Sequence, residues 1–355
     1  MYRCLTEITI TQEALGRNKV YKLNFCTNVE IESSWQTLTN TAKVVLPKNL
    51  YVKSDNKSVT WFNKAIVNSD NPILLRGDKI NIKLGYLWRD NLGAEQRQLN
   101  EVFDGYITKI NNRIPIELEC QDNMYKLKQI QLPSKSWKGY TLGQMLKEVL
   151  GNSYDVSTTE GLDISTYVSN NVTVSQALSE LKTIYGVSCY FKGNRLISSG
   201  MPYETTGRAE HIFDFQKNVI SDDLHYKRKD DQNIVVRAIS LYSEGNKKKK
   251  LSLYVPKEDA SAEVKTFHFL NVNNLEDLRK LANDRIKKYW YEGWEGTFET
   301  FGLPFVNHGD VAILRDKVLP ERNGAFLVKK VNYEMGMNGF RQKIEVDIKL
   351  SDLDD

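Results

Sequence analysis

Apolar and polar residues alternate along many short segments of the first 120 residues. Within each segment every second side chain is apolar, a period of two that is typical of strands with one buried face and one face in water. Strands of this kind form antiparallel sheets rather than parallel ones. The pattern therefore predicts an antiparallel β sandwich or barrel, with strands at residues 21–25, 29–32, 42–46, 78–84, 102–110 and 114–120.

The pattern changes to a helical period between residues 136 and 200. Thr141 with Gln144, and Thr173 with Gln176, each match a capping box, in which the Thr hydroxyl and the Gln side chain satisfy backbone amides at a helix start. Apolar residues at helical spacing follow each box, and a glycine, at 151 and at 186, stands where each helix should end. A Gly-Asn pair at 193–194 predicts a tight hairpin. We therefore expect a small α+β segment between two β regions.

Alternation returns after residue 205, and one helix interrupts it. Residues 233–239 and 251–255 predict strands on either side of a polar loop that contains the lysines at 247–250. Asn274 is placed to cap a helix whose apolar stripe consists of Leu275, Leu278, Leu281, Ala282, Ile286 and Tyr289. Further strands are predicted around 296–300, 311–314, 325–328 and 343–348.

These elements predict an α+β chain that is mainly β. We expect two similar antiparallel β-barrel domains, at residues 1–128 and 205–355, separated by an α+β insertion at 129–204. One inserted helix, at about 274–290, belongs to the second barrel domain.

The two β regions repeat one order of turns and strands. Each opens with a Gly-Asp turn and a strand, and continues through a glycine-containing strand and a polar turn into a last alternating strand. The connection after the first strand is longer in the first copy, at 88–100. Either one barrel is present twice, or two unrelated meanders share common turn chemistry. The turn residues concerned are Gly77, Asp78 and Gly105 in the first copy, and Gly309, Asp310 and Gly324 in the second.

Composition and charge narrow the function classes. The 355 residues suit two to three domains, and 49 basic against 45 acidic residues leave a net charge of +4. That charge is too small for nucleic acid or an anionic membrane to be the main partner. No apolar run is long enough to span a bilayer, and the N-terminus lacks the pattern of a secretory signal. Cys4, Cys26, Cys120 and Cys189 are scattered, which favours buried, small apolar residues with free thiols in a reducing compartment.

The sequence contains no motif of a catalytic, cofactor or metal site. The histidines form no His-Glu-x-x-His pattern, and no nucleophile elbow, phosphate loop or dinucleotide fingerprint occurs. We therefore predict no catalytic residue, no cofactor and no metal. The acidic pairs at 222–223 and 230–231 are interpreted as parts of solvated loops, and the lysines at 247–250 as a solvated hairpin tip rather than a phosphate site. The histidines, interpreted as surface or loop residues, are His211, His225, His268 and His308.

Trp290, Tyr291 and Trp294 form an unusual aromatic cluster. Trp and Tyr are enriched both in cores and at subunit interfaces. The cluster is expected either to pack beneath the last barrel or to contact another subunit.

Several of these features together resemble one family, the baseplate hub proteins of contractile-tailed phages. The features are the two Gly-Asp meanders, the capped helices between them, and residues 300–304, which lead into the second Gly-Asp turn. Residues 104–107 and 120–127 are similar to the end of the family's first barrel, and residues 324–328 and 335–340 to its closing hairpin. The family includes the late-control protein D proteins, Mu-like prophage tail proteins and the N-terminal part of type VI secretion spike proteins.

The resemblance implies a homotrimeric ring around an axial channel. Two similar barrels in each of three subunits give six barrels, so the ring would adapt a sixfold tail tube to a threefold central spike. It also implies contacts with the tail tube protein, the central spike protein and other baseplate proteins, but no specific nucleic acid and no membrane insertion. The expected location is the tail baseplate of a virion, after assembly in the host bacterial cytoplasm. Since the sequence ends at Asp355, the spike is expected to be a separate protein.

Two other function classes remain open. The many aromatic residues on predicted strands are also compatible with a carbohydrate-binding or adhesion module, which predicts exposed Trp or Tyr in a shallow groove. An enzyme of unrecognised type would instead show a pocket with perturbed carboxylates.

Overall fold

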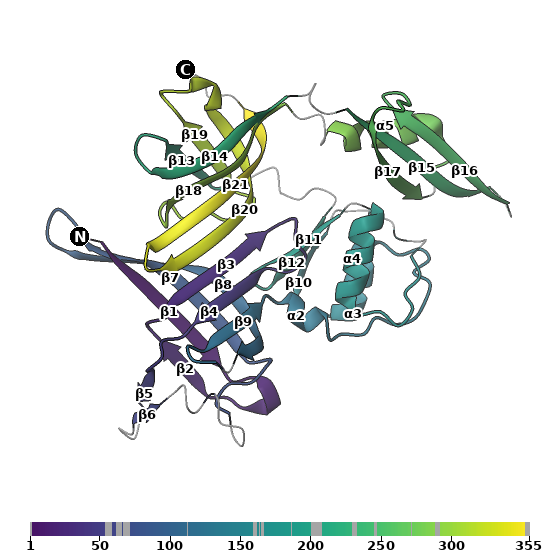
Figure 1. Ribbon diagram of the computed structural model, residues 1–355. Coiled ribbons are helices and arrows are strands. Elements are labelled where there is room, and N and C mark those ends of the chain that lie inside the picture. The colour runs from purple at the N-terminus through teal and green to yellow at the C-terminus, as the bar shows by residue number, and fades with distance from the viewer. Residues whose placement is uncertain are drawn as a thin grey trace.

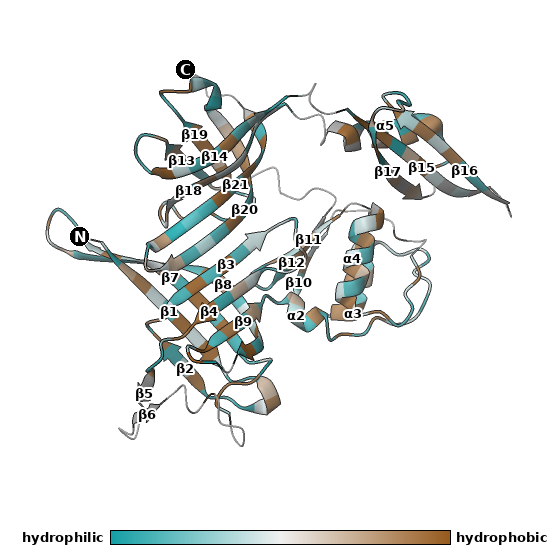
Figure 2. Cartoon of the chain, viewed as in Figure 1, coloured by the Kyte–Doolittle hydropathy of each residue, from teal (hydrophilic) through white to brown (hydrophobic). Residues whose placement is uncertain are grey.

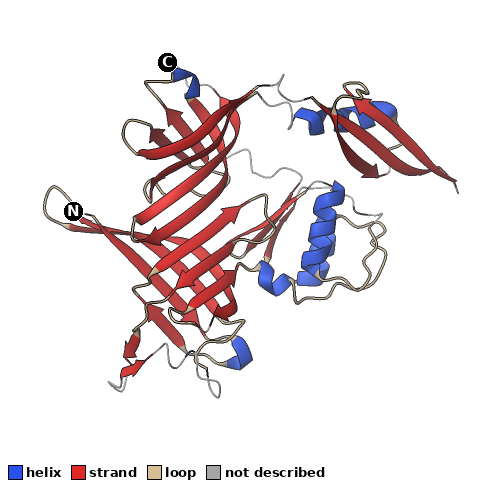
Figure 3. Ribbon diagram, in the orientation of Figure 1, coloured by secondary structure: helices blue, strands red, loops and turns tan. Residues whose placement is uncertain are grey.

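The computed structural model describes residues 2–53, 59–61, 66, 72–111, 113–158, 162, 164, 167–185, 187–199, 208–228, 233–244, 247–270, 272–287 and 292–351. Strands make up most of the described chain, as Figure 3 shows, and the mainly β class expected from the sequence is confirmed. No helix in these ranges is both long and apolar enough to cross a membrane.

One antiparallel-rich sheet of 13 strands contains strands from both β regions (Figure 1). In the first region these are β1 (Arg3–Thr11), β2 (Val20–Leu23), β3 (Asn28–Ser34), β4 (Thr41–Val45), β7 (Lys79–Arg89), β8 (Glu95–Asn111) and β9 (Glu117–Gln121). In the second region they are β13 (Glu210–Asp214), β14 (Val219–Lys227), β18 (Gly293–Phe301), β19 (Val311–Arg315), β20 (Gly324–Gly336) and β21 (Gly339–Ser351).

The same strand order occurs in each half of this sheet. In the first half the neighbours run β1-β7-β8-β9-β4-β3, and in the second half β13-β19-β20-β21-β18-β14. Matching strands also follow one another in the same order along the chain. One pairing differs, because β1 is antiparallel to β7 whereas β13 is parallel to β19. The halves therefore share a six-strand topology.

The edge strand of the first half pairs with a middle strand of the second half, so the two halves form one sheet instead of two separately closed barrels. β3, the last strand of the first half, pairs antiparallel with the second part of β20. The expectation of two separate barrels is thus not confirmed, and no closed barrel forms among the described residues. The physical reason is that the free edge of β3 finds its partner in the other half of the chain, which satisfies its backbone groups.

Strand alternation gives this sheet one apolar and one polar face, visible as alternating colours in Figure 2. The apolar face carries the largest core, to which both halves contribute, for example Ile8 and Ile82 from the first and Phe298 and Phe340 from the second. All four of these side chains are buried.

The α+β segment forms a separate small unit with its own core. Its sheet has the order β10-β12-β11, with β10 (Asp155–Thr158), β12 (Arg195–Ser199) and β11 (Ser188–Lys192), and its helices are α2 (Met124–Leu127), α3 (Leu142–Leu150) and α4 (Val174–Tyr185). Both capping boxes are confirmed: Thr141 and Thr173 accept the Gln144 and Gln176 amides, each at 3.3 Å, and the Gln side chains bond back. The Gly-Asn hairpin at 193–194 joins β11 to β12 as expected; Gly186 lies outside the described residues.

A third unit lies between β14 and β18 in the sequence. Its sheet has the order β16-β15-β17, with β16 (Lys247–Val255), β15 (Ile234–Glu244) and β17 (Glu263–Leu270), and helix α5 (Leu275–Lys287) packs on it. The sequence predicted one inserted helix within the second barrel domain, whereas this helix belongs to a sheet of its own. The lysines at 247–250 were expected in a loop; they lie on β16, paired with residues 241–244 of β15.

Only part of the stripe expected on α5 is buried. Leu278, Ala282 and Ile286, spaced by four, are at most 2% exposed, whereas Leu275 is 51% and Leu281 40% exposed. A spacing of four keeps the first three side chains on the face toward the sheet, and Leu281 lies off that face; Leu275 is the first residue of the helix. Asn274 caps the helix as predicted, because its Oδ1 accepts the Glu276 amide at 2.8 Å. Tyr289 lies outside the described residues.

Some strand boundaries differ from the sequence expectation. β7 extends to Arg89 and β8 begins at Glu95. Most of the loop expected at 88–100 is therefore part of a long β hairpin. β9 begins at Glu117, so residues 114–116 lie before the strand. The remaining elements are the pair β5 (Tyr51–Lys53) and β6 (Val59–Trp61), and the short 3-10 turns η1 (Ala14–Gly16) and η3 (Pro320–Arg322).

Candidate functional site: the polar face of the large sheet

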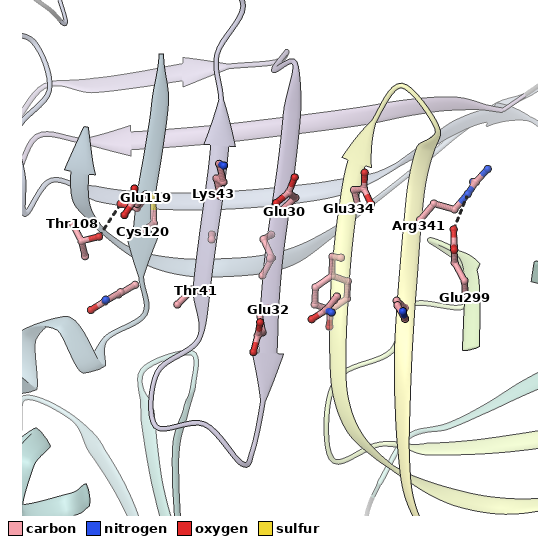
Figure 4. A pocket seen from close by; sticks show the side chains of 16 residues that line it. Glu30, Glu32, Thr41, Lys43, Thr108, Glu119, Cys120, Glu299, Glu334 and Arg341 are labelled. Atoms are coloured by element: carbon pink, nitrogen blue, oxygen red, sulfur yellow. Dashed lines mark hydrogen bonds and ion pairs between the residues drawn. The ribbon is translucent and has the colours of Figure 1, made fainter. Parts of the chain in front are cut away.

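The polar face of the large sheet is hollowed where the two halves meet. A hollow of about 540 Å³ extends over β9, β4, β3, β20, β21 and β18. Alternation places its lining: Val29, Ile31 and Val44 point into the core, whereas Glu30, Glu32 and Lys43 point outward. Figure 4 shows these side chains beside Glu334, Arg341 and Glu299 of the second half. We call this surface the polar face.

Charge on the polar face is mixed and slightly negative. Five carboxylates line the hollow against three cations, an excess of two negative charges. Opposite charges also pair across strands, for example Lys330 with Glu32 at 2.8 Å and Arg341 with Glu299 at 3.8 Å. The lining charges are Glu30, Glu32, Glu119, Glu299 and Glu334 against Lys43, Arg341 and Lys343. These residues belong to no sequence motif; their signal in the sequence is the polar position of each alternating strand.

Chemically reactive groups do not converge on this face. Cys120 borders the hollow, but burial raises the pKa of its thiol far above the usual range, so the nucleophilic thiolate is disfavoured. Burial also raises the pKa of Asp122 to about 7. That carboxylate accepts the Asn40 amide at 2.9 Å and the Met124 amide at 3.0 Å, so it fixes a turn before α2 rather than facing the hollow. Within the described ranges, no three His, Cys, Asp or Glu side chains gather as metal ligands would.

The described lining of the hollow forms no aromatic platform. Tyr333 is the one aromatic residue in this described lining; it is 2% exposed and donates its hydroxyl to the Val306 carbonyl at 2.7 Å. The groove of exposed aromatics expected for a carbohydrate-binding module is thus not found at this hollow.

The first predicted Gly-Asp turn precedes β7. Gly77 has φ +94°, in the region that favours glycine. Its amide donates to the Ile107 carbonyl at 2.8 Å, and the Ile107 amide donates to the Asp78 carbonyl at 2.9 Å. Within the turn, the Asp78 amide donates to the Leu75 carbonyl at 3.2 Å, and the Leu75 amide donates to Asp78 Oδ2 at 2.8 Å. The turn therefore anchors β7 to β8.

The second Gly-Asp turn repeats this arrangement before β19. Gly309 has φ +86° and donates to the Val328 carbonyl at 2.8 Å, and the Val328 amide donates to the Asp310 carbonyl at 2.9 Å. The Asp310 amide donates to the Asn307 carbonyl at 3.2 Å, and the Asn307 amide donates to Asp310 Oδ2 at 2.8 Å. All four hydrogen bonds of the first turn thus recur.

The two aspartates differ in their charged partners. Arg17 Nη2 contacts both Asp78 oxygens, at 3.0 and 2.8 Å, and the Ala14 amide donates to Oδ1 at 3.0 Å. Asp310 instead contacts His211 Nε2 at 3.1 Å. Both partners come from the segment that begins the respective half.

The duplication extends to a bulge in the middle strand. Between β8 and β9 the register skips Thr108, after Ile107. Between β20 and β21 it skips Lys329, after Val328. The matched positions show that Lys109 corresponds to Lys330.

The two predicted glycines of these strands are not equivalent. Gly105 lies two residues before Ile107, whereas the residue two before Val328 is Phe326, not Gly324. A Cβ at Gly105 would lie 2.2 Å from the Gln121 carbonyl oxygen, so close strand approach requires glycine there. Gly324 opens β20 opposite Leu314.

The remaining sequence-predicted residues lie elsewhere. Trp294, on β18, is partly buried against the main core, and its Nε1 donates to the Glu321 carbonyl at 3.0 Å; Trp290 and Tyr291 lie outside the described residues. The pair at 222–223 was expected in a loop but lies on strand β14, where Asp222 accepts from Arg322 at 3.1 Å. The pair at 230–231 lies outside the described residues.

The three histidine side chains that the structure describes lie apart from one another. His308 lies in the second Gly-Asp turn, and its ring packs edge-on against Tyr190 of β11 at 4.8 Å between centroids. Burial lowers its pKa to about 4. His211 lies on β13, His225 is exposed on β14, and the backbone of His268 is on β17.

A buried tyrosine that sequence reasoning missed ties the halves together. Tyr86 of β7 donates its hydroxyl to the Phe340 carbonyl at 3.0 Å and accepts the Gly302 amide at 3.1 Å. A Cβ at Gly302 would lie 2.0 Å from the Phe340 ring, so glycine is required at this crossing. Residues 300–304, part of the family resemblance, therefore lie at the junction of the halves.

Two solved structures match the fold of this chain over nearly their whole length. The tail protein from Neisseria meningitidis MC58 matches with a TM-score of 0.64 at 14% identity, covering 97% of this chain and 96% of that chain. The 43 kDa tail protein of prophage MuSo2 from Shewanella oneidensis matches with a TM-score of 0.58 at 13% identity, covering 96% and 97%. The chain has the fold of phage and prophage tail proteins.

A protein of a secretion system also has a similar fold. The E. coli c3393 protein, described as a type VI secretion component structurally similar to T4 tail proteins gp27 and gp5, matches with a TM-score of 0.51 at 8% identity, covering 92% of this chain and 74% of that chain. No family model and no curated protein matches the sequence. The resemblance to tail hubs inferred from the residues is confirmed as a likeness of fold.

Proposed function

We propose that the chain is a structural protein of a phage or prophage tail baseplate, and that three copies form a ring around an axial channel. The observation that carries the proposal is the repeat of six strands, including the matched Gly-Asp turns and the bulge. Two similar scaffolds in each chain give six in a trimer, which suits contact with a sixfold tail tube on one side and a threefold spike on the other. Other baseplate proteins would complete the assembly in the virion.

In this proposal the polar face forms the channel wall. It is hollowed, spans both halves, and carries paired charges with a small negative excess. A wall of this kind stays hydrated and does not attract a polyanion that passes through the channel, because proteins bind nucleic acid mainly through basic surfaces that contact the phosphates. The function is geometric and needs no catalytic residue.

Mass and shape in solution test the ring. Light scattering should give three times the chain mass, and negative-stain electron microscopy should show threefold particles with a central opening. A species that stays at the mass of one chain at the highest soluble concentration would count against the ring. Specific binding on a glycan array would favour the adhesion alternative instead.

A further inference from the structure

One junction between the two halves already exists inside the chain. β3 pairs antiparallel with β20 in the register Lys330↔Ser34, Val331↔Ser33 and Asn332↔Glu32, and continues to Met335. Ser34 Oγ also donates to the Lys329 carbonyl at 3.2 Å. This junction joins the last strand of one half to the middle strand of the next half.

The internal repeat identifies the counterparts of both edges. β14 corresponds to β3. In the first half β3 pairs with β4, which pairs with β9, and in the second half β14 pairs with β18, which pairs with β21. Following the registers β14·β18 and β18·β21, Lys227, Tyr226 and His225 correspond to Ser34, Ser33 and Glu32. Lys109, Ile110 and Asn111 of β8 correspond to Lys330, Val331 and Asn332.

These two counterparts lack the pairing that their equivalents have. Among the described residues, β14 pairs along one edge only, with β18. Residues 109–111 of β8 pair with β9 on one side. On the other side β8 pairs with β7, but that pairing reaches only to Tyr106. Each half thus presents one strand edge that its twin uses for the junction.

We propose that β14 of one protomer pairs antiparallel with Lys109–Asn111 of β8 in the next, in the register Lys109↔Lys227, Ile110↔Tyr226 and Asn111↔His225. The inference rests on the proposed ring and specifies its subunit contact. The contact is head-to-tail, so it can repeat from one protomer to the next, and in the proposed ring it closes at three copies. It covers the sheet edge at β14, which would otherwise remain open to unspecific pairing.

The side chains on the two edges suit this contact. Tyr226 is 46% exposed and lies on the same strand face as buried Leu224, so pairing with Ile110 would cover it. Arg113, just beyond β8, and Asp223, on β14, are both exposed and carry opposite charges. Lys109 and Lys227 would face each other, but each already contacts a carboxylate, Glu119 at 2.9 Å and Glu295 at 3.4 Å.

Disulfide trapping tests the register. In a Cys4→Ser background, which removes the exposed native thiol, the variant Asn111→Cys with His225→Cys should form covalent dimers and trimers under mild oxidation. The matched control is Asn111→Cys with Ser221→Cys, which lies four residues along the same strand and the same strand face. Each single variant should remain uncrosslinked, because a head-to-tail contact brings two different sites together.

Light scattering on the same reduced samples separates the two proposals. Trapping specific to the 111/225 pair supports the β14·β8 contact. A trimer mass without trapping, or with equal trapping of both pairs, overturns this contact and leaves the ring in place. A monomer mass without trapping overturns both. Circular dichroism of the reduced variants shows that each is folded.

Discussion

Removal of the Asp78 carboxylate tests whether the Gly-Asp turns hold the fold together. Asp78 is fully buried, and its oxygens accept two backbone amides, from Ala14 and Leu75, as well as the Arg17 guanidinium. Asp78→Ala leaves all three donors without this acceptor. Breaking a buried pair and orphaning its donors costs about 3–5 kcal/mol of unfolding free energy.

The twin turn supplies an internal comparison. The Asp310 carboxylate accepts one backbone amide, from Asn307, and contacts His211. Asp310→Ala should therefore cost less, about 1–3 kcal/mol. The ranking follows from the number and charge of the donors, because the backbone geometry of the two turns is the same.

Hydrogen exchange is the suitable assay, because a chain with several units need not unfold in one step. Asp78→Ala should increase exchange mainly in β7 and at the Ile107 amide, and Asp310→Ala mainly in β19 and at Val328. Urea midpoints give the overall ranking. Asp90→Ala is the control: Asp90 also accepts turn amides, from Leu92 and Ala94, but those hydrogen bonds are exposed and water can replace them.

Equal effects of Asp78→Ala and Asp90→Ala would refute this reasoning, since burial would then not matter. A larger loss for Asp310→Ala than for Asp78→Ala would refute the ranking by donors.

Three further predictions concern other contacts. Tyr86→Phe should lower the unfolding free energy by about 0.5–1.5 kcal/mol in urea titrations, because both hydrogen bonds of the hydroxyl are lost while the Gly302 amide still donates to the Phe340 carbonyl; an unchanged midpoint would contradict this. Thr141→Ala should cost about 1 kcal/mol and speed exchange in α3, whereas Thr141→Ser should not. Burial lowers the pKa of His308 to about 4, so the unfolded chain binds its proton first as pH falls from 6.5 to 4. The unfolding free energy of the wild type should therefore fall by up to about 3 kcal/mol relative to that of His308→Gln over this pH range. Parallel curves of unfolding free energy against pH for the two proteins would contradict this prediction.

Local signals in the sequence were sufficient for individual elements. The capping boxes at Thr141 and Thr173 place two helices because their hydrogen bonds involve residues only three positions apart. The Gly-Asp turns were equally visible, since Gly77 and Gly309 adopt positive φ within the turn itself. Such features depend on neighbours in the chain and are therefore readable from it.

Pairing between distant segments was not readable. Nothing in Ser33 or Ser34 indicates that β3 joins β20, so the sequence suggested two closed barrels instead of one shared sheet. The lysines at 247–250 look like a loop, but pairing with β15 makes them part of a strand. The polar face was missed for the same reason: Glu30 and Glu334 become neighbours only when β3 and β20 pair.

The pairing of β3 with β20 has a consequence for synthesis. Ser34 and Lys329, which bond at this junction, are 295 residues apart. At about 5–20 residues per second, a ribosome takes on the order of 15–60 s to deliver β20 after β3. During that interval the edge of β3 has no partner in its own chain, and nearby nascent chains on one message would be exposed to cross-pairing through it. Like charges directly opposite each other disfavour strand pairing, so Glu30 and Glu32 would oppose in-register pairing with a second copy of β3.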